Sequence, residues 1–282
     1  MLRGMRLSLL TDAHLVASPA DDHRALRFHN AYELEAGQAI LARAVDAAVE
    51  ARPDAIVLLG DLANDGDAEV LQRAIEVASR PGIPVWAVAG NHDVIGRGDG
   101  LATAAAASGR DVTVLGDRGI GVGGFTVVGV AVTTDDGGET GRGPAPVGAH
   151  DAGDEPLLVL SHLPLLSLRA EIEAAGFPYA GDLTNLAEVA GAVLARRTPT
   201  VVLSGHLHAR VARSEGPLLQ LVFPALVEEP HEIAVVDLER DGTACRVGSR
   251  TLRVFEGGGG TAALLGPARA SWRGGPDGWR AE

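Results

Sequence analysis

The sequence is poor in several features that mark particular classes of protein. Its 282 residues include a single cysteine, Cys245, so no intramolecular disulfide can form and nothing points to an oxidising compartment. No apolar stretch has the ~20 residues that a membrane-spanning helix needs. The first ten residues also lack the apolar length and the small-residue cleavage site of a signal peptide. These absences predict a cytoplasmic protein that does not enter a membrane.

Positive charge is scarce as well. The chain has 24 basic and 37 acidic residues, a formal net charge of −13, and its basic residues form no long run. This balance argues against a long nucleic acid as the main partner. It does not exclude a small phosphorylated substrate, because bound metal ions would reverse the sign of the local charge.

No proline-rich or serine-rich linker divides the chain, and 46% of its residues are hydrophobic. We therefore expect one catalytic domain over residues 1–256. Residues 257–282 are rich in glycine and contain Trp272 and Trp279. They predict a C-terminal tail that is either disordered or docks through its tryptophans onto a partner chain, so a homo-oligomer is one arrangement that the sequence allows.

Five short apolar runs are each followed by side chains that can bind metals. The runs cover residues 7–10, 55–59, 85–89, 157–160 and 201–203, and each has the pattern of a buried strand. The side chains that follow them are, in order, Asp12 and His14, then Asp61, then Asn91, His92 and Asp93, then His162, then His206 and His208. Because sites in α/β sheets collect at strand carboxyl ends, we expect these residues to meet at one edge.

Taken one at a time, such residues are more often turn residues, helix caps or structural histidines. Burying so many titratable groups at one edge without cations would be costly, so the set as a whole favours metal binding. Glycines precede Asp61, Asn91 and His206, where they allow a sharp turn or a close approach. In an extended segment, residues two apart point to the same side. We therefore expect Asp12 with His14, and His206 with His208, to present two donors in one direction.

Helical patterns separate the first three strands. Residues 36–51 and 68–79 each carry an apolar stripe, and Asp67 is a plausible N-cap for the second. This alternation predicts an α/β protein with right-handed crossovers. Later runs at residues 125–132, 218–223, 233–238 and 250–255 indicate a second, largely antiparallel sheet. Two mixed sheets packed face to face with helices outside would form a four-layer αββα sandwich.

The ordered set of motifs resembles the calcineurin-like metallophosphoesterase family. The resemblance spans residues 7–208, and no ligand position departs from the family's pattern. Residues 60–66 (GDLANDG) are most similar to the class III cyclic-nucleotide phosphodiesterase and glycerophosphodiesterase branch. The segment lacks the Asp-Arg-Gly typical of protein serine/threonine phosphatases and the tyrosine typical of purple acid phosphatases.

The resemblance implies two metal sites that share the Asp61 carboxylate. One ion would be held by Asp12, His14, Asp61 and His208. The other would be held by Asp61, Asn91, His162 and His206. Carboxylate, imidazole and amide donors suit iron, manganese or zinc.

The resemblance also implies a reaction. Water activated as hydroxide by the two metals would attack phosphorus directly, with no covalent enzyme intermediate. His92 would stand over the leaving group, and Asn64 and Asp93 complete the set of expected catalytic residues. The sequence thus predicts a dinuclear metal-dependent phosphoesterase that acts on a small phosphodiester, such as a cyclic nucleotide or a glycerophosphodiester.

Two alternatives stay open from the sequence. A phosphomonoesterase of the same fold would share all metal ligands, because loop residues distinguish a monoester from a diester. A metal-binding scaffold without turnover is the other alternative, and the presence of His92 beside a complete ligand set counts against it.

Overall fold

The computed structural model describes residues 3–18, 27–96, 99–134, 140–143, 153–179, 181–257, 266–275 and 277–282. Its elements are, in chain order, β1 (Arg3–Leu10), α1 (Gly37–Glu50), β2 (Ala55–Leu58), α2 (Ala68–Ser79), β3 (Val85–Ala87), α3 (Gly100–Ser108), β4 (Val112–Val114), β5 (Ile120–Val122), β6 (Phe125–Val130), β7 (Thr133–Thr134), β8 (Thr140–Arg142), β9 (Leu157–Ser161), α5 (Arg169–Ala174), α6 (Leu186–Leu194), β10 (Thr200–Ser204), β11 (Val211–Glu215), β12 (Leu218–Val222), β13 (Glu232–Asp241), β14 (Ala244–Arg253), β15 (Arg269–Gly275) and β16 (Gly278–Ala281).

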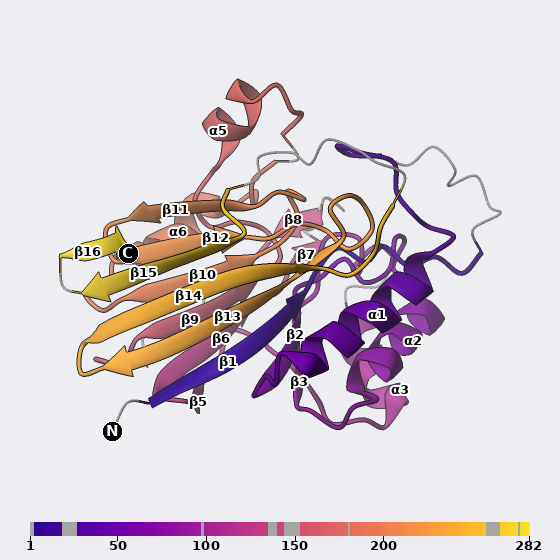
Figure 1. The fold of residues 1–282 in the computed structure, drawn as a ribbon, viewed down its shortest axis with the longest axis horizontal. Helices are drawn as coiled ribbons and strands as arrows, with labels where there is room; N and C mark the ends of the chain where they lie inside the picture. The colour runs from indigo at the N-terminus through magenta and orange to yellow at the C-terminus, as the bar shows by residue number, and fades with distance from the viewer. Residues whose placement is uncertain are drawn as a thin grey trace.

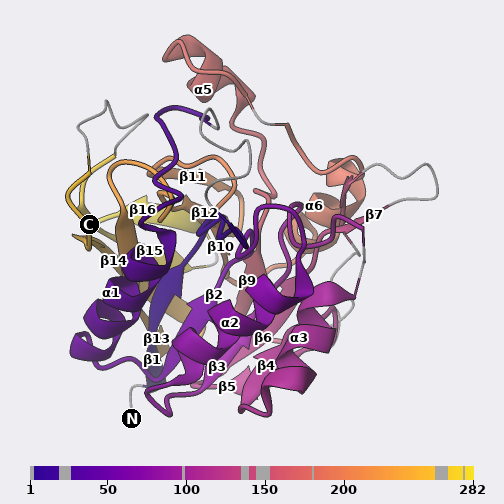
Figure 2. The same cartoon turned by 90° about the vertical axis from the view of Figure 1, so that its right-hand side faces the viewer.

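Two mixed sheets lie face to face (Figure 1). The eight-stranded sheet has the order β16-β15-β14-β13-β1-β2-β3-β4, and the six-stranded sheet has the order β11-β12-β10-β9-β6-β5. α1, α2 and α3 lie together outside the part of the larger sheet formed by β1 to β4 (Figure 2). The predicted four-layer αββα architecture of mixed sheets is confirmed.

Strand β2 shows how the sequence specifies these layers. Its residues alternate between two cores, because successive side chains of a strand point to opposite faces. Val57 packs between the two sheets with Leu9 and Leu158, whereas Ile56 belongs to the core beneath the helices together with Leu41. All of these side chains are buried, and each contributes roughly 1.5–3 kcal/mol of hydrophobic stabilisation.

The helix α2 follows the sequence prediction to the residue. Asp67 precedes it, and the Asp67 carboxylate accepts hydrogen bonds from the backbone N–H groups of Glu69 at 2.8 Å and Val70 at 3.0 Å. These bonds satisfy donors that a helix start otherwise leaves free. α2 thereby fixes the segment that leads from the end of β2 to β3.

The prediction of a second, largely antiparallel sheet is wrong. The central strands β6, β9, β10 and β12 of the six-stranded sheet are parallel, and only its edges β5 and β11 are antiparallel. β13 and β14 belong to the other sheet. There β13 pairs with β1, from which it is separated by most of the sequence. Pairing between such distant segments leaves no mark in local sequence patterns.

Residues 266–275 and 277–282 of the C-terminal tail are ordered, contrary to the disorder that was one of the two predicted alternatives. β15 and β16 extend the eight-stranded sheet, and Trp272 and Trp279 pack against the core between the sheets of their own chain. Gly274 permits this packing, because a Cβ at that position would lie 2.8 Å from the Trp279 ring. The Trp279 indole N–H also donates to the Pro217 carbonyl at 2.7 Å. Residues 258–265 and 276 lie outside the described part.

The carboxyl ends of β1, β2, β3, β9 and β10 carry the predicted site residues, so the two sheets contribute jointly to one site. No helix in the described ranges is long and apolar enough to cross a membrane.

Candidate metal centre

The turns after the strands adopt an unusual backbone conformation. The φ angles lie between 43° and 66° at five candidate ligands, namely Asp12, His14, Asp61, His206 and His208. Left-handed backbone at residues other than glycine costs of order 1–3 kcal/mol each and is typical of functional sites. The expectation that Asp12 with His14, and His206 with His208, lie in extended segments is therefore wrong.

Hydrogen bonds between the turns hold this strained backbone in place. The His14 N–H donates to the Asp61 carbonyl at 2.9 Å, and the Gly205 N–H donates to the His162 carbonyl at 3.0 Å. Asp12 is tied to a third segment, because its carbonyl accepts the Val227 N–H at 3.0 Å. Within each sheet, the neighbouring turns that carry candidate ligands are thus linked through their main chains.

The motif glycines are required by close approach, as the sequence predicts. A Cβ on Gly90 would lie 2.1 Å from Asp61 Oδ1, and one on Gly205 would lie 2.4 Å from Asp12 Oδ2. A Cβ on Gly60, whose φ is 89°, would lie 2.7 Å from His162 Nδ1. Any side chain at these positions would displace a candidate ligand.

The predicted ligands form two adjacent groups, and a third group of neighbouring ligand atoms joins His14 and Asp61 with His92. The ligand atoms of Asp12, His14 and His208 lie within 4.8 Å of one another, and so do those of Asp61, His162 and His206. In the first group, His208 Nε2 lies 3.2 Å from Asp12 Oδ1. In the second, His162 Nε2 lies 3.1 Å from Asp61 Oδ2. Asp61 also approaches the first group, because His14 Nε2 is 3.7 Å from its Oδ2.

Several buried polar atoms at this centre have no hydrogen-bond partner. They are Asp12 Oδ1, His14 Nε2, Asn91 Oδ1, His162 Nε2 and His206 Nε2. Leaving a buried donor or acceptor unpaired costs roughly 1–3 kcal/mol each. Since all five belong to residue types that ligate iron, manganese or zinc, the centre fits a pair of metal ions.

Hydrogen bonds at the opposite ring nitrogens orient these imidazoles. His162 Nδ1 donates to the Leu59 carbonyl at 2.7 Å, and His14 Nδ1 donates to the Asn64 side-chain oxygen at 3.2 Å. In the neutral form of each ring, a protonated Nδ1 leaves a lone pair on Nε2, so both rings can present a ligand atom to the centre.

The charges of the centre support cation binding. Burial alone would raise the pKa values of Asp12 and Asp61, but neighbouring histidines hold both well below the usual range. Burial opposes a charged His208, yet Asp12 and Glu228 raise its pKa to about 10. In the same way, Asp61 and Asp12 overcome burial and raise the pKa of His162 to about 9. Without a bound cation, protons on these two rings balance the aspartates.

The other two candidate histidines behave differently. Burial lowers the pKa of His14 to about 3 and that of His206 to about 4. Both rings are therefore neutral near pH 7, which is the form that ligates a metal.

The three predicted catalytic residues occupy distinct places. His92 lines the cavity, and its Nδ1 donates to the Asn64 backbone carbonyl at 2.6 Å. The Asn64 side chain contacts His14 rather than His92. The structure does not bring Asp93 to the cavity, because its carboxylate accepts the backbone N–H groups of Leu62, Ala63 and Gly90. Burial and the nearby Asp61 charge raise the pKa of Asp93 to about 6.

Three residues that adjoin the centre escaped the sequence prediction. The buried Glu228 carboxylate contacts His208 Nδ1 at 2.7 Å, and Phe28 and Tyr32 line the cavity. Glu228 follows an apolar run like the other site residues, but a single glutamate there has no distinctive pattern. The signal for Phe28 and Tyr32 is the occurrence of two rare aromatic residues in the loop that follows Asp12.

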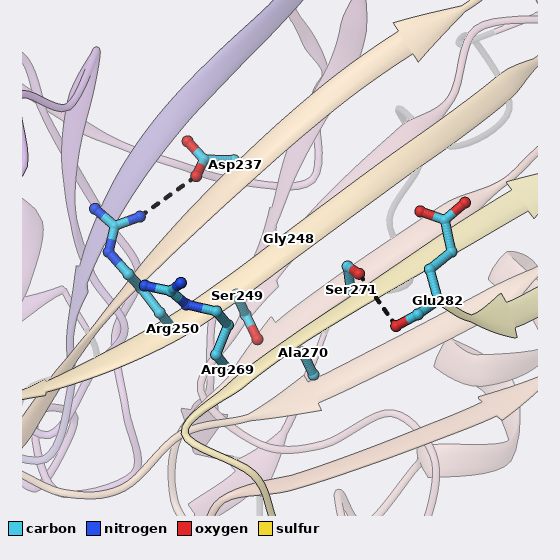
Figure 3. Close-up of a pocket in the computed structure, with 8 residues that line it drawn as sticks. All are labelled: Asp237, Gly248, Ser249, Arg250, Arg269, Ala270, Ser271 and Glu282. Atoms are coloured by element: carbon cyan, nitrogen blue, oxygen red, sulfur yellow. Dashed lines mark hydrogen bonds and ion pairs between the residues drawn. The ribbon is translucent and has the colours of Figure 1, made fainter.

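The cavity above the centre has a volume of about 230 Å³. A larger hollow of about 570 Å³ lies on the outer face of β13, β14 and β15 (Figure 3). There Arg250 Nη1 points to Asp237 Oδ2 at 3.5 Å, and Ser271 Oγ donates to the Glu282 backbone carbonyl at 3.4 Å. None of the residues that line this hollow is a predicted site residue, so the smaller cavity is the candidate site.

Two face-to-face sheets with carboxylates and histidines at their strand ends define a metal-dependent hydrolase of the αββα class. Comparison with protein families gives the particular family. The family model described as calcineurin-like phosphoesterase matches residues 5–210, and the chain belongs to this family. The protein is therefore a metal-dependent phosphoester hydrolase.

Solved structures with this fold include two phosphatases. A dimetal phosphatase from Danio rerio superposes with a TM-score of 0.58 at 13% identity, over 90% of this chain and 100% of that one. A purple acid phosphatase from yellow lupin (Lupinus luteus) seeds superposes with a TM-score of 0.51 at 13% identity, over 94% of this chain and 54% of that one. At these identities the likeness concerns the fold alone. Among curated proteins, none matches this chain significantly.

Proposed function

We propose that this protein hydrolyses small phosphodiesters, with catalysis centred on the cavity described above. The observation that carries the proposal is the composition of the cavity lining. Among the described residues, the cavity is lined by His14, Phe28, Tyr32, Asp61, Asn91, His92, His206 and His208, and none of them is an arginine. A phosphomonoester carries about −1.5 to −2 at neutral pH, whereas a diester carries a single negative charge. Such a wall favours the less charged ester.

The two groups of ligands would each hold one metal ion. Asp12, His14, Asp61 and His208 would hold the first, and Asp61, Asn91, His162 and His206 the second. When bound, the ions would supply polarisation of the phosphoryl oxygens and activation of a water molecule. The donor set supports manganese, iron or zinc, which metal analysis of the purified protein would distinguish.

His92 is the residue we assign to the leaving group. Its Nδ1 is engaged by the Asn64 carbonyl, so its Nε2 is free to face the cavity. From that position the ring could stabilise the leaving oxygen or transfer a proton to it. Asp93 would act by positioning, since it joins the turn at Gly90 to the turn at Leu62 and Ala63.

A comparison of two substrates tests the proposal. We expect the metal-stripped protein to be inactive, and the manganese-reloaded protein to have a kcat/KM for bis-p-nitrophenyl phosphate at least about tenfold above that for p-nitrophenyl phosphate. The reverse preference would indicate a phosphomonoesterase. Inactivity toward both compounds and toward cyclic nucleotides, with both sites loaded, would indicate a metal-binding scaffold.

A further inference from the structure

Two of the few aromatic side chains in this protein stand over the candidate metal centre. The whole chain has only five phenylalanines, two tyrosines and three tryptophans. The Tyr32 ring centroid lies 5.1 Å from that of His14 and 5.7 Å from that of His208. The Phe28 ring meets His208 edge-on at 5.4 Å. Phe28 and Tyr32, which we call the aromatic wall, thus form the side of the cavity above the first group of ligands.

Hydrogen bonds fix the segment that carries the aromatic wall. The His29 ring donates to the Leu207 carbonyl at 2.9 Å, within the turn that carries His206 and His208. The Asn30 N–H donates to the Glu228 carboxylate at 2.7 Å, and the Glu33 N–H donates to the Val227 carbonyl at 2.7 Å. The wall therefore stands in a defined position relative to the centre.

The same carboxylate serves both the wall and a candidate ligand. One oxygen of Glu228 accepts the Asn30 N–H and the other accepts from His208 Nδ1. Because Glu228 is fully buried, this linkage is shielded from solvent. Glu228 thus joins the wall segment directly to a candidate ligand.

The remainder of the cavity is polar. Asn91 and His92 line it together with the ligands of the floor, whereas the wall offers two rings and no charged group. Burial raises the pKa of Tyr32 above its usual value, so its side chain is a neutral phenol. A bound phosphoryl group would face the ligands, and one of its ester substituents would lie against the rings.

We infer that Phe28 and Tyr32 recognise a flat aromatic or heteroaromatic substituent of the phosphoester, in preference to an alkyl or glycerol group. Ring faces bind planar groups by stacking or edge-on contact, which adds to the contribution of buried area. A non-planar group of equal bulk gains only the free energy of burying its apolar area. The inference rests on the proposed function and narrows its substrate class.

Phosphonates with a single substituent test this inference without requiring turnover. The probes are phenylphosphonate, cyclohexylphosphonate and methylphosphonate, titrated calorimetrically into manganese-loaded protein. We expect phenylphosphonate to bind about tenfold more tightly than cyclohexylphosphonate, which matches its bulk but is not planar. In Phe28→Leu the preference should shrink to about twofold or less, while the affinity for methylphosphonate and the metal content stay unchanged.

Phe177→Leu is the matched control. The Phe177 ring lies 4.9 Å from the His29 ring, packs against the cluster that contains Leu168 and Ile172, and is not among the described residues that line the cavity. This variant should keep the full preference for phenylphosphonate. Equal binding of the phenyl and cyclohexyl compounds to the wild-type protein would overturn the inference, as would an equal loss of all three probes in Phe28→Leu.

Turnover of bis-p-nitrophenyl phosphate, measured on the same samples, separates the inference from the proposed function. Turnover without a preference for the phenyl probe would overturn the inference alone. A phenyl preference without turnover of any phosphoester would contradict the proposed function and support the aromatic wall as a binding site. Absence of binding by all three probes would count against both.

Discussion

Glu228 Oε1 lies 2.7 Å from His208 Nδ1, and Glu228 is fully buried. The carboxylate accepts a hydrogen bond from the Nδ1–H group, which turns Nε2 of His208 toward Asp12, 3.2 Å away. A carboxylate behind a histidine ligand fixes the orientation of the ring and increases its basicity. Glu228 is therefore expected to increase the metal affinity of the first group of ligands without itself binding a metal.

Replacing Glu228 by glutamine should weaken metal binding about 10–100-fold, because the variant lacks the charge that orients His208. Competition with a chromophoric chelator measures this affinity without recourse to activity. Glu155→Gln is the control, since Glu155 pairs with Arg240 at 3.1 Å and contacts none of the candidate ligands. Equal affinities in the two variants would remove Glu228 from the centre.

Replacing His92 by alanine should lower turnover of a phosphodiester by about 100-fold or more, which is the usual contribution of a positioned acid or base. Metal content should stay at the wild-type level, because His92 belongs to neither of the two proposed ligand sets. Steady-state kinetics and elemental analysis of the same preparation check both statements. Unchanged turnover, or loss of metal, would contradict this role.

Metal binding at pH 7 should release about two protons. In the metal-free protein the pKa values of His162 and His208 are raised to about 9 and 10, so both rings are protonated at pH 7 and must become neutral to ligate. His14 and His206, with pKa values lowered to about 3 and 4, release none. Calorimetry in buffers of different ionisation enthalpy counts the protons. Heats that do not depend on the buffer would contradict the prediction.

The same pKa shifts set the pH dependence of stability. A raised histidine pKa stabilises the metal-free fold fully below the unfolded-state pKa of about 6.5, and this contribution is lost as the pH rises through about 9 to 10. Metal affinity should change in the opposite direction over that window, since deprotonation supplies the ligands. The melting temperatures of metal-free and metal-loaded protein should therefore diverge between pH 7 and 10.

Replacing Gly90 by alanine should destabilise the protein by about 1–3 kcal/mol and reduce metal binding, because its Cβ would lie 2.1 Å from Asp61 Oδ1. Gly191→Ala is the matched control. Gly191 lies within α6 with no atom near its Cβ position, so the change should stabilise by about 0.5–1 kcal/mol. Thermal unfolding measures both, and similar effects of the two changes would show that Gly90 has no special role.

Local features of the fold followed from the sequence, and features set by distant contacts did not. The apolar stripe and N-cap of α2 are local, so its bounds were predictable. The assignment of β13 to the larger sheet depends on pairing with β1, more than 200 residues earlier in the chain, and no local pattern records such a pairing.

In the candidate site, too, local features were predictable from the sequence and features set by distant contacts were not. The candidate ligands were predictable because each follows an apolar strand. The left-handed backbone at His14 was not, since it depends on a hydrogen bond to Asp61 in another turn. Glu228 was missed because its contact with His208 joins two turns that are unrelated in sequence pattern. The contribution of Phe28 and Tyr32 to the cavity wall was likewise not predictable, because it depends on how their loop folds over the centre.

The most direct test of the account is the metal stoichiometry of Asp61→Asn, because Asp61 is proposed to be shared by both ions. Wild-type protein should bind two manganese ions per chain. The variant should lose affinity for both ions together, and its turnover of bis-p-nitrophenyl phosphate should fall with the metal content. Retention of one ion at wild-type affinity would contradict a shared carboxylate, and with it the dinuclear centre proposed for this cavity.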